Sequence, residues 1–205
     1  MREAFERELD RIESVLVSQG VSALQALEIA VNGLNAPVGN AGEVIALDAR
    51  VDSAGREIEA SVETLLARQS PVAADLRRTL ALFRTSQHLR RVGRNASRIV
   101  QRETEGVAFP DRMEEMGALS ASMLTLALDA FSRREAALVD ELRRMDDRLD
   151  RDHRIALEEI VTARGVDPAT LVSTILIARS LERVGDHAVA IGEECAYLVA
   201  GRRVR

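Results

Sequence analysis

A short motif that occurs twice in the chain carries carboxylates suited to binding a cation in one of its copies. Residues 89–97 read LRRVGRNAS and residues 181–189 read LERVGDHAV, so both copies share the frame L-x-R-V-G-x-x-A. Glu182 and Asp186 of the second copy stand four residues apart, and residues at that spacing share one face of a helix. The second copy therefore presents two oxygen ligands side by side, the kind that hard divalent cations prefer.

A further pair of carboxylates precedes each copy of the motif. Asp146 and Asp150 occur in MDDRLD, and Asp48 and Asp52 occur 98 residues earlier in LDARVD. The motif itself repeats at an offset of 92 residues, because Glu182 aligns with residue 90. The difference between the two offsets falls around a predicted helix junction, where changes in length are tolerated. We infer that the chain contains an internal repeat.

The carboxylates of the second half are expected to gather between two neighbouring helices. Extending each face adds a histidine and one more glutamate, so the set comprises Asp146, Asp150, His153, Glu182, Asp186 and Glu193. Apart from what loops or the fourth helix supply, these faces are expected to lack basic residues. Close carboxylates repel strongly in a low dielectric unless protons or a cation compensate.

Carboxylate oxygens suit iron, manganese, magnesium or calcium better than a thiolate-seeking metal. We therefore predict a divalent metal, iron or another, in the second half of the chain. The four carboxylates that form the two spaced pairs are the main candidate ligands, and His153 and Glu193 are weaker ones.

The first half carries its own positive charges at the same place. Arg90 and Arg94 occupy the positions of the two motif carboxylates, and they are expected to face Asp48 and Asp52. Arginine forms planar, bidentate pairs with carboxylates. Our hypothesis is that these ion pairs replace a metal, so no metal is expected in the first half.

A simpler interpretation stays open for both acidic faces. Carboxylates four apart on a helix are usually just solvated, and Arg179 or Arg183 would be available to pair with those of the second half. Histidines such as His153 are individually more typical of surface or core positions than of metal ligands. Under this interpretation the protein is a plain helical scaffold without a metal.

Helices are expected to position these residues. The chain of 205 residues is 46 % hydrophobic, 30 % charged and only 2 % aromatic, and it is rich in Ala, Leu, Glu and Arg, which favour helix. Apolar residues recur at helical spacing in three segments of each half, with an interruption of the first segment near Gly20. Breaker residues at 35–42 end that first segment.

Two similar signals mark helix starts in the two halves. Ser70 and Pro71 are expected to cap and begin the third helix, and Asp167 and Pro168 to begin the last, which runs to Gly201. Long helices with short connections pack as neighbours. We predict an all-α fold of two antiparallel three-helix bundles related by a pseudo-twofold axis. Their expected boundaries are 1–104 and 105–205, with TEGVAFP (104–110) as the linker.

Composition and motifs exclude several classes of function. The net charge of −5 argues against a general nucleic-acid binder. The opening residues lack the features of a signal peptide, and no apolar run approaches the roughly 18–20 residues of a membrane span. The single cysteine fits a reducing compartment. We expect a cytoplasmic protein that meets a membrane only through partners.

Enzymatic function is not expected. The sequence has no P-loop, no Ser/His/Asp pattern and no Gly-rich phosphate cradle. The alternative is a helical-bundle enzyme with a carboxylate-bridged di-metal centre. Such bundles carry a Glu-x-x-His pattern on two helices, whereas this chain offers only Asp150-x-x-His153, once.

Taken together, these residues resemble the PhoU family of accessory regulators of phosphate transport. The resemblance covers essentially the whole chain and is strongest at LDARVD, at TLLARQSPVAADLR (64–77) and at LERVGDHAVAIGEECAYLV (181–199). It implies two spectrin-like three-helix bundles, some of which carry multinuclear iron or other metals in this family. By the resemblance, Glu182 and Asp186 inherit the ligand role, with Asp146 and Asp150 as partners. The first copy departs from the pattern because both motif carboxylates are replaced by arginine.

The resemblance also implies a regulatory role without a catalysed reaction. PhoU-like proteins link the ATPase subunit of the phosphate ABC transporter to a sensor histidine kinase. They keep the phosphate-starvation response off when phosphate is plentiful. We expect the same negative regulation here, with this chain acting as an adaptor and forming a homodimer.

Overall fold

The chain folds into long α-helices joined by short connections, as the computed structural model describes over residues 2–34, 40–102 and 109–201. The helices are α1 (Arg2–Gly33), α2 (Ala41–Gln69), α3 (Ala73–Val100), α4 (Asp111–Arg133), α5 (Val139–Thr162) and α6 (Pro168–Ala200), with a short 3-10 helix, η1 (Ala136–Leu138), before α5. The described residues contain no strand. The predicted all-α fold class is confirmed.

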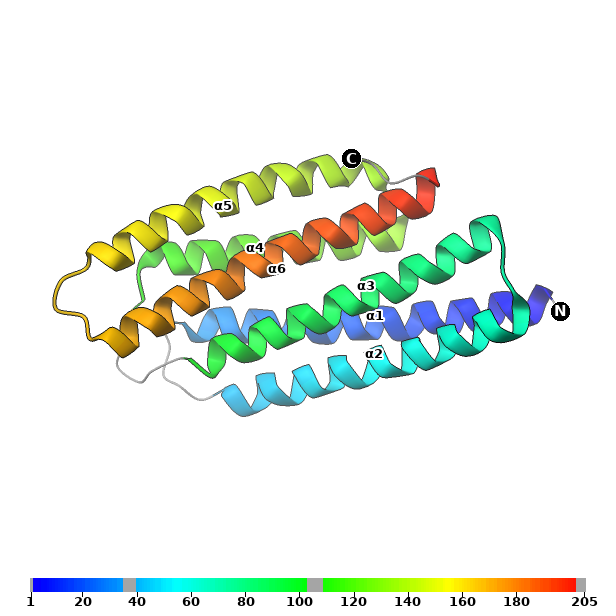
Figure 1. Ribbon diagram of the computed structural model, residues 1–205, viewed down its shortest axis with the longest axis horizontal. Helices are drawn as coiled ribbons and strands as arrows, with labels where there is room; N and C mark the ends of the chain where they lie inside the picture. Colours follow the sequence, from blue (N-terminus) through cyan, green and yellow to red (C-terminus); the bar gives the residue numbers. More distant parts are fainter. Residues whose placement is uncertain (1, 35–39, 103–108, 202–205) are drawn as a thin grey trace.

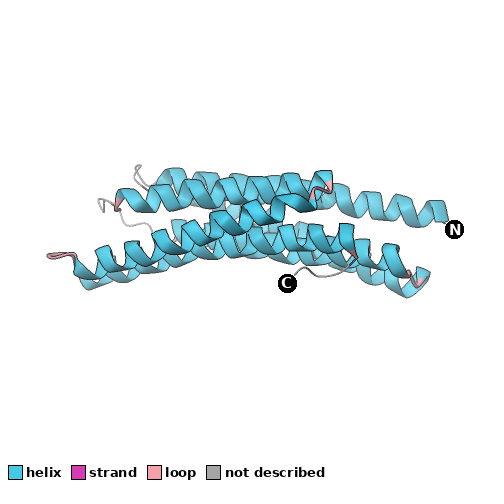
Figure 2. Cartoon of the chain, turned by 90° about the horizontal axis from the view of Figure 1, so that it is seen from above, coloured by secondary structure: helices cyan, strands magenta, loops and turns pink. Residues whose placement is uncertain are grey.

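The helices form two groups of three that pack side by side (Figure 1). α1, α2 and α3 contact one another, as do α4, α5 and α6. Between the groups, α3 packs against α6 and α1 packs against α4, so that α2 and α5 lie at opposite edges. Seen from above, the molecule is long and shallow, with the helix axes running along its length (Figure 2). The two acidic faces therefore lie between an edge helix and a central one.

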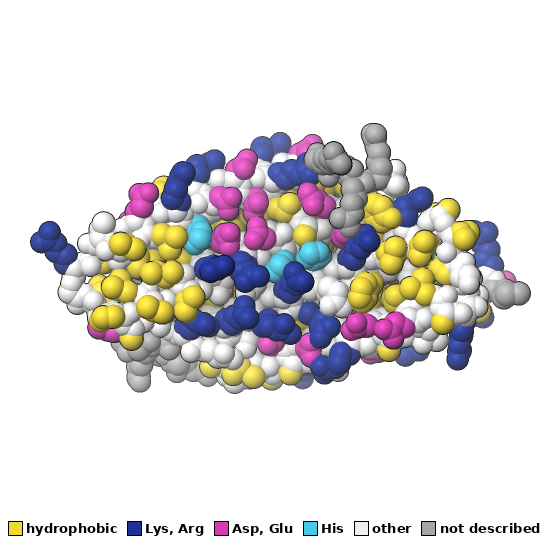
Figure 3. Space-filling model, in the orientation of Figure 1, with side chains coloured by type: hydrophobic (Ala, Val, Ile, Leu, Met, Phe, Trp, Pro, Cys, Tyr) yellow, Lys and Arg dark blue, Asp and Glu magenta, His cyan; other side chains and the backbone are white. Residues whose placement is uncertain are grey.

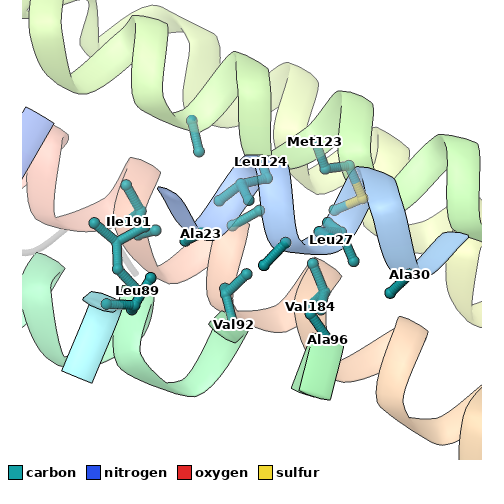
Figure 4. Close-up of a cluster of buried hydrophobic side chains, with 14 of the residues drawn as sticks. Ala23, Leu27, Ala30, Leu89, Val92, Ala96, Met123, Leu124, Val184 and Ile191 are labelled. Atoms are coloured by element: carbon teal, nitrogen blue, oxygen red, sulfur yellow. The ribbon is translucent and has the colours of Figure 1, made fainter. Parts of the chain in front are cut away.

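One hydrophobic core runs through both groups of helices. Leu27 of α1, Leu89 of α3, Leu124 of α4 and Val184 of α6 are fully buried members of the same cluster. Figure 4 shows that these side chains meet where the four central helices pack together. Because burial of apolar surface is the main stabilising term in folding, this shared core fixes α3 against α6.

Helix α1 continues through Gly20, where the apolar stripe of the first segment is interrupted. A Cβ at Gly20 would lie 2.8 Å from Leu128 Cδ2 of α4, and one at Gly117 of α4 would lie 2.6 Å from Val31 Cγ1 of α1. Both glycines therefore serve the close packing of α1 on α4. A glycine at a helix contact and a glycine at a helix break look the same in the sequence.

One predicted helix start is confirmed and the other is wrong. Asp167 caps α6, because its carboxylate accepts hydrogen bonds from the backbone N–H of Ala169 at 2.9 Å and of Thr170 at 3.1 Å. Ser70 instead ends α2 in a left-handed conformation with φ 42°, and its N–H donates to the carbonyl of Leu66. α3 begins only at Ala73. A proline just after a helix end prevents that helix from continuing, so the Ser–Pro signal belongs to the stop of α2.

The remaining boundaries lie close to the expected ones. α1 and α2 end and begin around the breaker segment, and Gly201 ends α6 with φ 70°. α3 ends at Val100. The predicted boundary at 104/105 and most of the predicted linker fall on residues 103–108, which lie outside the described residues.

Helix α1 corrects one expectation about apolar segments. Among the described helices, it alone contains an 18-residue window with the apolar composition of a membrane span. In the structure α1 packs against α2, α3 and α4. Its apolar stripe contributes side chains such as Leu9, Ile12 and Leu16 to the core.

Candidate functional site

The acidic face of the second half lies at a close contact between α5 and α6. A Cβ at Gly185 of α6 would lie 2.4 Å from Leu149 Cδ2 and 3.2 Å from Asp146 Oδ1, both on α5. Leu149 is fully buried, so it has little room to move away. The absence of a side chain at Gly185 therefore sets how closely Asp146 approaches the motif on α6.

Replacing Gly185 by alanine is expected to lower the free energy of unfolding by roughly 1–3 kcal/mol, because the added methyl group overpacks this contact. Gly42 provides a matched control, since a Cβ there would meet nothing within 4 Å. Gly42→Ala should leave the stability unchanged or raise it by up to ~1 kcal/mol through helix propensity. Denaturant unfolding of both variants measures the difference, and equal effects would contradict the close contact.

Asp146 is the least compensated carboxyl of this face. Its Oδ1 is buried and has no hydrogen-bond partner among the described residues. Burial, together with the negative charges of Asp150, Asp186 and Asp147, raises the pKa of Asp146 to about 6. The site therefore favours either a proton or another positive charge at this oxygen.

Glu182 and Asp186 belong to the same electrostatic cluster. Partial burial raises the pKa of Glu182, with Asp186 and Asp150 adding to the rise, while Arg179 opposes it. The pKa of Asp186 is raised by partial loss of hydration and then by Asp150. All four main candidate carboxylates therefore influence one another across α5 and α6. In the described part of the chain, however, no group of three or more His, Cys, Asp and Glu side chains is placed to hold a metal ion.

The pH dependence of stability should report the raised pKa of Asp146. A carboxyl whose pKa is higher in the folded state stabilises the fold below its unfolded pKa, and this contribution is lost as pH rises through the folded value. In metal-free buffer, Asp146→Asn should therefore gain stability relative to the wild type by about 1–2 kcal/mol between pH 4 and pH 7, after allowance for solvent screening.

Asp52→Asn supplies a control of opposite sign for this pH series. The pKa of Asp52 is lowered by its hydrogen bond from Arg90, so its contribution is present at neutral pH and is lost as pH falls through the lowered value. Asp52→Asn should therefore be less stable than the wild type at pH 7, and the gap should close in acid. Parallel pH profiles for the wild type and Asp146→Asn would contradict the assignment.

The two weaker candidates occupy different surroundings. His153 is partly buried on α5, and burial lowers its pKa while the nearby Asp150 raises it. Glu193 is exposed and accepts a hydrogen bond from Arg143 of α5 at 2.9 Å. The faces are therefore not free of basic residues, contrary to the sequence expectation. Long arginine side chains reach beyond the helix face on which they begin.

In the first half, Asp52 stands at the position that Asp150 occupies in the second half, and it is paired with arginine. Arg90 donates to Asp52 Oδ1 through Nε at 2.9 Å and through Nη2 at 2.6 Å. Arg94 Nη2 lies 3.9 Å from the same oxygen, and Arg56 pairs with the other oxygen. The hydrogen bond and charge of Arg90 lower the pKa of Asp52.

Gly55 makes room for the arginine of the first half. A Cβ at Gly55 would lie 2.4 Å from Arg90 Cδ. His153 stands 98 residues later, at the matching position of the second half. The glycine that makes room for Arg90 in the first half is thus replaced by a histidine in the second.

The two halves repeat the same helix contact. A Cβ at Gly93 would lie 3.0 Å from Asp48 Oδ1, just as one at Gly185 would lie 3.2 Å from Asp146 Oδ1. Burial raises the pKa of Asp48 as well, but Arg94 opposes this rise. Both halves therefore share the close contact between a glycine and an aspartate. The charge beside that aspartate differs, because only the first half places an arginine of the motif there.

A feature that the sequence pattern did not single out lies between α3 and α6. The rings of His88 and His187 are 5.6 Å apart between centroids. Burial lowers the pKa of His187 to about 4, and the positive charges of Arg91 and Arg183 contribute. Arg91 and Arg183 both occupy the arginine position of the repeated frame L-x-R-V-G-x-x-A. This shared arginine was the feature of the sequence that could have pointed to the contact. Figure 3 shows arginines gathered beside the acidic cluster on this face of the molecule.

The fold and the site together define a class: an all-helical protein built from a repeated three-helix unit, each unit carrying an acidic face between an edge helix and a central one. The family model of the PhoU domain matches the chain twice, over residues 16–102 and 113–195. The chain belongs to the PhoU family.

Several named proteins are similar over nearly the whole chain. The phosphate-specific transport system accessory protein PhoU homolog of Pseudomonas aeruginosa is 34% identical over 98% of this chain and 87% of its own length. The phosphate-specific transport system accessory protein PhoU of Serratia marcescens is 29% identical, with 98% of this chain and 86% of that protein covered.

Solved structures agree with the fold. The crystal structure of PhoU from Pseudomonas aeruginosa superposes with a TM-score of 0.90 at 33% identity, covering 97% of this chain and 100% of that chain. The phosphate transport system regulatory protein PhoU from Streptococcus pneumoniae gives a TM-score of 0.88 at 25% identity, with 98% and 99% covered.

Proposed function

We propose that this protein is a regulatory adaptor of phosphate uptake. It would link the ATPase subunit of a phosphate ABC transporter to a sensor histidine kinase and hold the phosphate-starvation response off when phosphate is plentiful. The observation that carries the proposal is the nearly full-length similarity to proteins named as accessory to the phosphate-specific transport system. The same two-unit fold in a protein named as a phosphate transport regulator supports it.

The adaptor acts through its surface rather than through a reaction. Long helices joined by short connections present extended faces on which two partners are able to dock at once. We propose a cytoplasmic location, a homodimer, and membrane contact only through the transporter and the kinase. Sedimentation analysis of the purified protein tests the dimer, and a monomer at micromolar concentration would overturn that part of the proposal.

The partners should be recovered together with the tagged protein from cells. We expect capture from phosphate-replete cells, after brief crosslinking, to enrich both the ATPase subunit and a sensor histidine kinase. Capture from phosphate-starved cells should recover less kinase, because the repressing complex is needed when phosphate is plentiful. Mass spectrometry with an unrelated tagged helical protein as the control measures the enrichment. Recovery of neither partner in either condition would contradict the adaptor role.

We further propose that a divalent cation, such as iron, manganese or magnesium, binds between α5 and α6. Its ligands would be Asp146, Asp150, Glu182 and Asp186, with His153 nearby. The unpartnered Oδ1 of Asp146 and the raised pKa values of Asp146, Glu182 and Asp186 support this assignment. Hard oxygen donors match these cations. When bound, the cation would screen the negative charges and tie α5 to α6.

No metal is proposed for the first half. There Asp52 already holds the Arg90 guanidinium, and Arg94 and Arg56 add positive charge around the same carboxylate. We propose that the arginines take the place of the cation. Pairing with arginine within the chain then offsets the desolvation free energy of the charged groups.

A further inference from the structure

A basic hollow lies between the two copies of the repeated motif. It has a volume of about 160 Å³, and its lining comes from α3 and α6: Arg91, Arg94, Asn95, Arg98, Arg183 and His187. The lining therefore holds four guanidinium groups, one amide and one imidazole, and it contains no carboxylate. The proposed adaptor role makes no use of this hollow.

The hollow follows the internal repeat. Arg91 and Arg183 are 92 residues apart, and so are Asn95 and His187. Each pair therefore occupies one position of the repeated frame, and both members of each pair line the same hollow. Because α3 packs against α6, the equivalent residues of the two halves meet there. The other two arginines belong to the first half alone.

The arginines of the hollow are poorly compensated. In the described part of the chain, no ion pair within 4 Å joins Arg91, Arg98 or Arg183 to a carboxylate, and Arg94 lies 3.9 Å from Asp52. Asp48 and Asp186 exert a longer-range attraction on this group from outside the lining. Like charges crowded at a helix contact repel one another, so this packing favours a bound anion.

A buried imidazole supplies a second, independent observation. His187 lines the hollow and is only 7% exposed, and its Nε2 has no hydrogen-bond partner among the described residues. A buried polar atom without a partner costs free energy unless a ligand or water satisfies it.

We propose that this hollow binds a phosphate-class oxyanion, which bridges Arg91 of α3 and Arg183 of α6. Guanidinium groups present a fork of N–H donors that matches the oxygens of a tetrahedral dianion, and such charge-assisted hydrogen bonds are strong. The small volume suits inorganic phosphate or a single phosphoryl group of a nucleotide. The bound anion would hold the two halves of the chain together at their shared contact.

Calorimetric titration of the purified full chain tests the site. Inorganic phosphate, ADP and chloride are titrated separately at constant ionic strength in metal-depleted buffer, because salt screens exposed charges. Arg91→Gln with Arg183→Gln is expected to weaken phosphate binding at least ~10-fold, through loss of the two facing forks. Arg50→Gln with Arg154→Gln is the charge-matched control, since both side chains are exposed and lie outside the hollow.

Thermal unfolding separates binding from a purely structural role. Without phosphate, the Arg91/Arg183 double variant should unfold at the same temperature as the wild type or higher, because repulsion has been removed. Phosphate should raise the unfolding temperature of the wild type and of the control variant only. If phosphate binds and ADP does not, the ligand of the hollow is the free ion. If ADP binds and phosphate does not, the ligand is the phosphoryl group of a nucleotide. Binding of neither, equal binding of chloride, or an unchanged double variant would overturn the proposal, without touching the adaptor role.

Discussion

Manganese added to the metal-free protein is expected to raise its unfolding temperature by roughly 5–10 °C at a concentration one hundred times the dissociation constant, which corresponds to about 2.7 kcal/mol. The double variant Glu182→Gln, Asp186→Asn should not respond. The reason is electrostatic: without a cation, the wild type holds several carboxyls together whose pKa values are already raised by burial and by one another. A bound divalent cation turns that repulsion into attraction.

The control for this shift lies in the other half of the chain. Asp48→Asn with Asp52→Asn removes the equivalent carboxylates and breaks the pair with Arg90. This variant should be less stable than the wild type, yet it should show the same rise with manganese. The Glu182/Asp186 variant should be at least as stable as the wild type in metal-free buffer, because both substitutions remove repulsion. A rise of equal size in both double variants would contradict a site in the second half.

Reversing the charges of the first half should create a second cation site. In metal-free buffer, Arg90→Glu with Arg94→Asp is expected to lower the free energy of unfolding by roughly 2–4 kcal/mol, because Asp52 loses its partner and gains negative neighbours. Gly55 leaves space beside the new glutamate, which is shorter than the arginine it replaces. Manganese should then restore part of the lost stability.

The number of bound metal ions measures the outcome of this reversal. Native mass spectrometry should find one more site in the Arg90/Arg94 variant than in the wild type. Arg90→Gln with Arg94→Gln is the matched control, because it removes the same positive charges without supplying ligands. If the charge-reversed variant folds and its metal content equals that of the control, the idea that arginine replaces a metal loses its support.

The sequence predicted the acidic faces because they rest on local spacing. Residues four apart on a helix share a face whatever the tertiary structure, so the Glu182/Asp186 and Asp146/Asp150 pairs follow from the pattern alone. The repeat then indicated which helices face each other. Matching contacts of Gly93 with Asp48 and of Gly185 with Asp146 agree with that inference.

Features that depend on helix ends and side-chain reach were harder to predict. Ser70 and Asp167 both precede a proline, but only Asp167 accepts hydrogen bonds from the next helix, while Ser70 closes the previous one. Glu193 lies two helical turns beyond Asp186, which is about 10 Å along the axis. At that distance it pairs with Arg143 rather than joining the other carboxylates. A shared face is therefore not a shared site when the separation along the helix is large.

The contact between the two halves was not predictable from either half alone. Nothing in the spacing of Arg91 or Arg183 indicates that α3 packs against α6 rather than against solvent. Periodicity reports which side of a helix is apolar, but it does not report which other helix that side will contact. The basic hollow between the motifs emerged only from the packing of the two units.

In the proposed function, the two halves neutralise the same acidic position in different ways, with a cation in one and with arginine in the other. Anomalous scattering from crystals grown with manganese tests it most directly, because it locates the ion. We expect a peak between α5 and α6, beside Asp146, Asp150, Glu182 and Asp186, and none beside Asp48 and Asp52. A peak in the first half, or crystals at saturating manganese with none between α5 and α6, would contradict it.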